Sequence, residues 1–475
     1  MLIEPRAHAL RRGVTRRVSV PVAIVAGSVA LAALSLLFPS APTYDPWAWI
    51  IWGREITQLD LDTVDGPSWK PLPVLFTTVF ALFGDTAAPN LWLVVARAGS
   101  IAALPLGFLL AVRLVGDRRA GAVAGLAAVA GIVCSPWWLR NGALGNSEGL
   151  LVALLFAAIL AHLHDRRGVA FAFGLGVALL RPEAWPFFGL YALWLLYEDR
   201  SRLPWVAGGL VSLPILWLGP ELWGSGNALR ASDRAQQPNP DSAAFADNPF
   251  LAVLEDTVEL LSWPSLAGVA LLLALAVARR DRASLGLAAF ALGWIVLVAA
   301  MTSNGFSGNL RYLIPPVALL IVLGAAGFVR AALPSLRGHP AALAVAAVAL
   351  VAAFATNEIG ELDDQVRSVK YQARNTDALP RVIEDSGGAA FLRDCGHAYT
   401  NPFLVPQVAW YLGVHSQEVD LDPDEERPAV VFHVKHTAGA RGRAPAFADK
   451  RGRSELARGG TWIVTADCDP AQGRR

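Results

Sequence analysis

Long apolar runs separated by short polar segments fill the first three quarters of the chain. Runs of about 17 to 25 residues are long enough to cross a bilayer as helices. Eleven crossings are predicted, over residues 19–39, 90–112, 120–138, 146–162, 168–184, 185–197, 203–219, 264–278, 284–301, 311–329 and 340–356. The pattern therefore predicts an all-α polytopic membrane protein.

Two shorter segments lie in the polar stretch after the first run. Residues 46–58 have the spacing of an amphipathic helix, and the apolar residues 71–83 end at Gly84. Neither segment is long enough to cross a bilayer comfortably. Both are therefore predicted to be interface helices in the first outer loop.

The pattern changes to a mixed, polar one from residue 357 onward. Helical spacing appears at 362–385 and 404–413, whereas β-branched runs at 429–435 and 461–466 predict strands, and 437–459 is predicted to be a loop. A small α/β domain is expected here.

The chain is thus expected to contain two domains, a transmembrane domain over 1–356 and an α/β domain over 357–475. Basic residues cluster in the N-terminal tail and in every second connecting loop, which places the N-terminus in the cytoplasm. The alternate segments are richer in Trp, Pro and acidic residues. We therefore expect the working surface and the C-terminal domain to face outward from the plasma membrane.

The amino-acid composition agrees with a membrane protein and argues against a nucleic-acid-binding protein. Hydrophobic residues make up 54% of the chain and charged residues 17%, and mean hydropathy is +0.43. The net charge of +1 argues against a nucleic-acid-binding protein, which normally carries a clear cationic excess. Among the few lysines, Lys70 alone precedes residue 370.

The three cysteines show no spacing typical of metal ligands. Cys134 lies in an apolar run and is expected to pack there. Cys395 and Cys468 lie in the polar C-terminal part, where they pair if that part faces an oxidising compartment and the fold brings them together. The sequence leaves this disulfide open.

Ionisable residues near membrane depth cost about 2.5–3.5 kcal/mol each on insertion scales, so those present are candidates for function. They lie at or near the predicted outer face: Asp45, Glu55, Lys70, Arg97, Arg140, Glu148, Arg181, Glu183 and Arg311. Carboxylates and cations are thus expected to converge at one face.

Four motifs occur in a recognisable order. They are an acidic residue soon after the first run (Asp45), K-P-x-P at 70–73, ARAGS at 96–100 and NLRYLIPP at 309–316. In this order and sidedness the chain resembles the polyprenol-phosphate-sugar glycosyltransferases of the GT-C superfamily, in the branch of protein mannosyltransferases and aminoarabinose transferases. The likeness covers roughly the first 330 residues. The chain departs from that branch in having Pro46 after Asp45 and Leu72 between the two prolines.

The resemblance implies transfer of a sugar from a polyprenyl-phosphate donor to an extracytoplasmic glycan, glycolipid or protein acceptor. Asp45 would be the general base, Glu148 a second acidic catalytic residue, and Lys70 and Arg311 the donor-phosphate ligands. Other substrate-binding candidates are Tyr312, Arg140, Asn146, Arg181, Glu183 and Trp69. No cofactor and no metal site are predicted, although a divalent ion between Asp45 and Glu148 is an alternative.

The chemistry agrees with these residue types. A base must take the proton of the acceptor hydroxyl, and cations must stabilise charge on the departing phosphate. One displacement step predicts inversion at the anomeric carbon. A lysine acts as a compact point charge, whereas an arginine offers several planar donors to the same oxygens.

Structural roles compete with these functional ones. Asp45 is also suited to cap the interface helix at 46–58, and Lys70 to extend its ammonium toward lipid headgroups. Arg97 is suited to pair with a carboxylate and thereby hold helices together. We expect Glu55 to be a solvated neighbour of Arg54.

Structural roles are also open for the Arg181–Glu183 pair and for Arg140. Arg181 and Glu183 flank Pro182 and are suited to form a structural ion pair at a helix break, and Arg140 is suited to bind lipid headgroups. At the level of the whole protein, the alternatives are a transporter or lipid flippase and a non-catalytic scaffold of envelope assembly.

Overall fold

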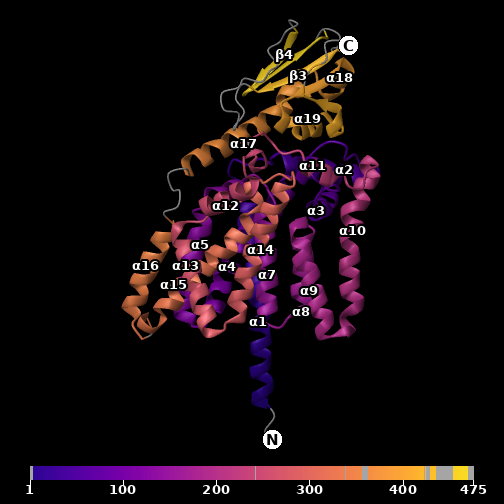
Figure 1. Cartoon of the computed structure of the whole chain (residues 1–475). Helices are drawn as coiled ribbons and strands as arrows, with labels where there is room; N and C mark the ends of the chain where they lie inside the picture. Colours follow the sequence, from indigo (N-terminus) through magenta and orange to yellow (C-terminus); the bar gives the residue numbers. More distant parts are fainter. Residues whose placement is uncertain are drawn as a thin grey trace.

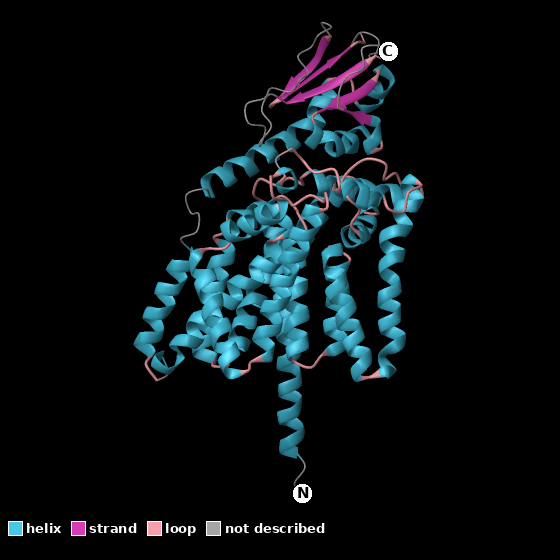
Figure 2. Ribbon diagram, in the orientation of Figure 1, coloured by secondary structure: helices cyan, strands magenta, loops and turns pink. Residues whose placement is uncertain are grey.

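The computed structural model describes residues 4–240, 242–336, 338–355, 362–421, 423, 428–434 and 453–468. Long helices run side by side to form a bundle, and a small sheet with its own helices lies across one end of it (Figures 1 and 2). The first helix enters at the opposite end (Figure 1). The chain thus has the architecture of a multi-pass membrane protein with a mixed cap.

Each of the eleven predicted runs forms a helix. These helices are α1 (Glu4–Ser35), α4 (Ala87–Val115), α5 (Arg118–Val133), α7 (Glu148–Leu163), α8 (Arg167–Ala178), α9 (Trp185–Glu198), α10 (Leu203–Ser225), α13 (Trp263–Arg279), α14 (Arg282–Ser303), α15 (Ile314–Leu336) and α16 (Pro340–Ala355). Among the described residues, four helices are long and apolar enough to cross a membrane, or six if two bent helix pairs each count as one span. The number of crossings stays a prediction.

The two predicted interface helices are present as α2 (Tyr44–Gln58) and α3 (Pro71–Ala81). Pro71 takes the first helical position of α3, where its missing N–H costs no hydrogen bond. The helices pack closely, because a Cβ on Gly53 would lie 2.4 Å from the backbone carbon of Thr77. The hydroxyl of Thr77 also donates to the carbonyl of Trp49 at 2.6 Å.

Short helices link the long ones at their ends. They are α6 (Pro136–Ala143), α11 (Arg230–Ala235), α12 (Pro249–Leu260), η1 (Pro182–Ala184), η2 (Arg200–Arg202), η3 (Ala243–Phe245) and η4 (Leu310–Tyr312). The break predicted around Pro182 is therefore real. It leaves Arg181 in extended backbone between α8 and α9.

We call the described residues from 362 to 468 the cap. Its helices are α17 (Leu362–Asp385), α18 (Ala389–Cys395) and α19 (Val405–Leu412), with the short turns η6 (Pro402–Leu404) and η7 (Ser416–Glu418). Its strands are β1 (His397–Thr400), β2 (Val419–Asp420), β3 (Ala429–Val434), β4 (Ser454–Gly459) and β5 (Trp462–Ala466). The cap is therefore α/β in composition, and α17 lies between its sheet and the bundle (Figure 1).

The five strands form one mixed sheet in the order β2-β1-β3-β5-β4. β1 pairs in parallel with β2 and β3, whereas β5 is antiparallel to both β3 and β4. The sequence predicted β3 and β5 but missed β1, β2 and β4. The loop predicted over 437–459 is wrong for its last six residues, which form β4, and residues 437–452 lie outside the described part.

A disulfide joins Cys395, at the end of α18, to Cys468, which follows β5. Their Cα atoms are 5.7 Å apart. The sheet brings these cysteines together because β1, which follows Cys395, and β5, which precedes Cys468, both pair with β3. Cys134 is the free cysteine of the chain and lies half-buried at the end of α5.

Candidate active site

The site begins at the first turn of α2. The backbone of Thr43 donates to the carbonyl of Leu144, and its hydroxyl donates to Asn146 at 3.0 Å, so the start of α2 is tied to the turn before α7. Thr43 takes the cap position, and Asp45 lies inside the first turn. Asp45 is only 7% exposed, and its carboxylate lies 2.7 Å from the guanidinium of Arg311. The interpretation of Asp45 as the helix cap is therefore wrong.

Lys70 immediately precedes α3 and points into the protein. It is 6% exposed, and its ammonium lies 3.4 Å from the hydroxyl of Ser147 and 3.9 Å from the carboxylate of Glu148. It also lies 4.9 Å from the centre of the Trp49 ring, a favourable position for a cation. The alternative in which Lys70 extends toward lipid headgroups is wrong.

Glu148 starts α7 and connects two cations. Its carboxylate lies 2.8 Å from Arg181 and 3.9 Å from Lys70, and the residue is 1% exposed. Arg181 also lies 3.8 Å from Glu183. The predicted Arg181–Glu183 pair therefore exists, but it belongs to a larger network.

Small residues bring α7 close to α4 at this level. A Cβ on Gly149 would lie 1.9 Å from the hydroxyl oxygen of Ser100, the last residue of the ARAGS motif. Helices in membranes often approach closely through such residues. The contact fixes the start of α7, where Glu148 lies, against α4, and it gives the ARAGS motif a structural reason.

Arg311 and Tyr312 come from the turn before α15. The side chain of Asn309 accepts a hydrogen bond from the backbone of Arg311 and so caps η4. The guanidinium of Arg181 lies 4.2 Å from the centre of the Tyr312 ring. This turn therefore joins the Asp45–Arg311 pair to the Glu148–Arg181 pair.

We call Asp45, Lys70, Glu148, Arg181, Glu183 and Arg311 the charged cluster. Three carboxylates balance three cations in it. Burial disfavours the charged form of Asp45, but Arg311 and Lys70 outweigh this effect and hold the pKa of the carboxyl below its ordinary value. Burial and the neighbouring Arg181 lower the pKa of Lys70 to about 7, against the opposing charge of Glu148. An added anion would restore the charge of this lysine.

Solved structures share this architecture. ArnT from Cupriavidus metallidurans bound to undecaprenyl phosphate matches with a TM-score of 0.56 at 15% identity, over 94% of this chain and 98% of ArnT. Its apo state matches with a TM-score of 0.52 at 16% identity, over 97% and 98%. The chain has the fold of ArnT. No protein-family model and no curated protein matches the sequence, so the comparison concerns the fold.

For three predicted substrate contacts, the hydrogen bonds or the exposure that the structure describes involve no member of the charged cluster. Asn146 accepts a hydrogen bond from Thr43 and donates one to Asn141. Trp69 is buried, and its indole N–H donates to the carbonyl of Leu216 at 3.0 Å. Arg140 is exposed on α6. Their described contacts are those of supporting or surface residues.

Two other ionisable residues have structural partners. Arg97 donates to the carbonyl of Ser35 on α1 and to the carbonyl of Ala143 on α6. It therefore holds helices together as expected, but these partners are carbonyls and not the expected carboxylate. The expectation of a solvated Glu55 is wrong. Glu55 is 1% exposed and lies 2.8 Å from His415 of the cap.

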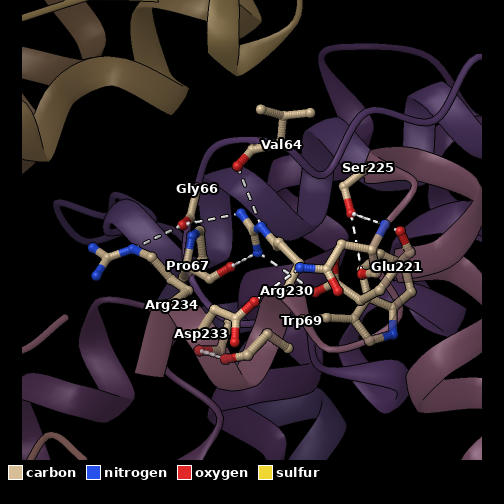
Figure 3. Close-up of polar contacts among 12 residues, drawn as sticks. Val64, Gly66, Pro67, Trp69, Glu221, Ser225, Arg230, Asp233 and Arg234 are labelled. Carbon is tan, nitrogen blue, oxygen red and sulfur yellow. Dashed lines mark hydrogen bonds and ion pairs between the residues drawn. The ribbon is translucent and has the colours of Figure 1, made fainter. Parts of the chain in front are cut away.

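The turn before Lys70 is held by residues that the sequence analysis missed. Arg230 of α11 donates to the carbonyls of Val64, Gly66 and Pro67, at 3.3, 3.3 and 2.7 Å (Figure 3). Its guanidinium also lies 3.5 Å from the buried Glu221. These contacts fix the turn that leads to Lys70. In the sequence, Arg230 is one of two arginines in the polar stretch between the runs at 203–219 and 264–278, and nothing in the pattern distinguishes it.

The described residues contain no group of three or more His, Cys, Asp or Glu side chains able to hold a metal ion. Asp45 and Glu148 each lie within 2.8 Å of an arginine instead. In this arrangement cationic side chains occupy the positions beside both carboxylates.

Proposed function

We propose that the chain is a membrane glycosyltransferase that transfers a sugar from a polyprenyl-phosphate donor to an acceptor hydroxyl, with inversion. One observation carries the proposal: Lys70, Arg181 and Arg311 converge from separate parts of the chain beside Asp45. A buried group of cations suits a phosphate, and a carboxylate among them suits a base. A protein of the same fold binds undecaprenyl phosphate, which supports a lipid phosphate as the ligand.

Arg311 is the first contact for the donor phosphate in this proposal. Its side chain is 25% exposed, whereas those of Lys70 and Arg181 are 7% and 5% exposed. Glu148 holds Lys70 and Arg181 near each other and thereby limits their repulsion. Its role is thus to organise the phosphate ligands.

The reaction is a single displacement. The acceptor oxygen attacks the anomeric carbon on the face opposite the phosphate, and a new C–O bond forms. The bond from carbon to the phosphate oxygen breaks, and its electron pair stays on the phosphate. The acceptor proton passes to Asp45. Negative charge grows on the lipid phosphate, where Lys70 and Arg311 stabilise it.

Donor binding also prepares Asp45. An arginine 2.7 Å away weakens this carboxylate as a base. A phosphate that attracts Arg311 removes part of that stabilisation and adds negative charge to a cluster in which acids and cations balance. Asp45 thus becomes a stronger base when the donor is in place.

We propose that the cap end of the bundle is extracytoplasmic and that the acceptor is a glycan, glycolipid or protein there. The cap carries the Cys395–Cys468 disulfide, and structural disulfides form in oxidising compartments. The N-terminus and the cap lie at opposite ends of the bundle, as the distribution of basic loops requires (Figure 1).

Asp45→Asn and Lys70→Ala test the proposal in membranes supplied with a labelled polyprenyl-phosphate sugar. Both should lose transfer, while Asp281→Asn should retain it. Asp281 is the matched control, since it also lies 2.7 Å from an arginine, Arg330, but at the start of α14, whereas the turn that carries Arg311 follows the other end of that helix. Unchanged transfer by both site variants would refute the proposed glycosyltransferase site. Donor binding without transfer by the natural sequence would favour the flippase or scaffold alternative.

A further inference from the structure

The cap covers one face of α2, the helix that carries Asp45. Trp47 packs against the rings of Trp410 and Tyr411 on α19, with ring centres 6.1 and 5.7 Å apart. At the start of α2, Tyr44 meets Phe403 edge to face at 6.3 Å. The opposite face of α2 packs on α3. The helix is therefore held between α3 and the cap.

Polar contacts fix the other end of α2. Arg54 donates to the carbonyls of Trp410 and Val414, at 3.3 and 3.0 Å, where α19 ends. An arginine there adds a hydrogen-bond donor to the last carbonyls and opposes the negative end of the helix dipole.

His415 forms the centre of this contact. Its Nδ1 lies 2.8 Å from Glu55, and its Nε2 lies 3.2 Å from Asp60. Only the protonated imidazole donates from both nitrogens at once. Glu55 also accepts the backbone N–H of Asp62 at 3.0 Å, so one carboxylate links α2, the following turn and the cap.

We propose that the cap positions the catalytic base: His415 and Trp410 hold α2 so that Asp45 meets Arg311. This inference rests on the proposed function. About ten residues, or roughly 15 Å of rigid helix, separate Asp45 from Glu55. A tilt at the Glu55 end therefore moves the carboxylate at the other end. Displacements of about 1 Å are enough to lower catalytic rates about a hundredfold.

The contact depends on pH through the charges that face His415. Glu55 and Asp60 contact its ring, and Asp62 lies nearby. Glu418 accepts the backbone N–H of His415. The adjacent cation is Arg54, which donates to the neighbouring carbonyl of Val414.

Burial disfavours the charged imidazole, but Glu55, Asp62 and Asp60 outweigh this effect and raise the pKa of His415. A raised pKa means that the docked His415 binds its proton more tightly than the undocked one does. The His415 contact is therefore strongest below the ordinary histidine pKa of about 6.5 and weakens as pH rises above it.

Amide hydrogen exchange of the full-length protein in lipid nanodiscs tests the docking without any substrate. His415→Ala should increase exchange across α2 at least tenfold and leave β3 protected, which shows that the cap remains folded. His415→Gln, which keeps one hydrogen bond to Glu55, should restore most of the protection and remove its decline between pH 6 and 8.5. His397→Ala is the matched control, because His397 pairs with Asp420 inside the cap at 2.9 Å.

Transfer kinetics complete the test. His415→Ala and Trp410→Ala should lower kcat tenfold or more, with donor KM changed less than threefold, because the phosphate-binding cations lie on other elements. Unchanged α2 exchange, or faster exchange with unchanged kcat, would overturn the inference. Faster exchange in His415→Ala together with no transfer by the natural sequence would refute the proposed function and support the docking.

Discussion

The carboxylate of Asp45 and the guanidinium of Arg311 lie 2.7 Å apart, although one belongs to the first connecting loop and the other to the turn before α15. The pair unites the candidate base with a candidate phosphate ligand. Each residue therefore affects the chemistry of the other, and substitutions of Arg311 should reveal it.

Arg311→Ala should lower kcat/KM about 10²- to 10³-fold, the usual effect of losing one charge-stabilising group. It should also shift the acidic limb of the pH profile. Asp45 must be deprotonated to act, and Arg311 now holds its pKa low, so loss of the arginine moves this limb to higher pH. The measurement is kcat/KM against pH. Arg330→Ala provides the control, and a rate loss without a shifted limb would contradict the pairing.

Lys70 should make donor binding depend on pH. Its pKa is about 7 without ligand, and only the protonated form attracts a phosphate, so the affinity should fall by up to about tenfold per pH unit above 7. Binding should be measured with a sugar phosphodiester, whose phosphate does not titrate near neutrality. Lys70→Arg keeps the charge at all pH values and should flatten the dependence. If the affinity of the natural sequence does not change with pH, Lys70 does not titrate near pH 7 and this prediction is wrong.

Gly53→Ala should destabilise the protein by about 1–3 kcal/mol, as expected for overpacking. The new methyl group would meet the backbone of Thr77, which cannot rotate away, and would push α2 from α3. Asp45 lies on α2 and Lys70 immediately precedes α3, so transfer should fall as well. Gly189→Ala in α9 is the control, because a Cβ there meets nothing within 4 Å. Thermal unfolding of both variants in detergent measures the difference.

Loss of the Cys395–Cys468 disulfide should lower the stability of the cap by about 2–5 kcal/mol. Cys395→Ser and Cys468→Ser should lower the unfolding temperature, and a reductant should do the same to the natural sequence. Cys134→Ser should leave the sensitivity to reductant unchanged, since Cys134 is unpaired. Identical unfolding with and without reductant would show that the bond contributes no stability.

Protease added to intact cells should remove the cap and leave the helical bundle. The expected cleavage follows from an extracytoplasmic cap, which the basic loops and the disulfide both favour. Immunoblotting with tags at the two termini distinguishes the products. Protection of a C-terminal tag in intact cells, with cleavage only after lysis, would reverse the proposed orientation.

Local signals were enough for much of the fold. The apolar runs predicted one helix each, because a chain in lipid must satisfy its backbone hydrogen bonds within the segment. Pro71 and Pro182 marked a helix start and a helix break for the same local reason. Short strands escaped prediction, because β1 and β2 have four and two residues and depend on pairing with distant partners.

The sequence by itself selected the charged residues, since ionisable groups near membrane depth are costly and few. Only the tertiary structure decided how they pair. It joined Asp45 to Arg311, buried Lys70 beside Glu148, and removed Arg140 from the cluster. Glu55 was expected to be solvated, but in the structure it is buried and contacts His415. Such pairings depend on contacts between segments that are tens to hundreds of residues apart, which periodicity and composition do not encode.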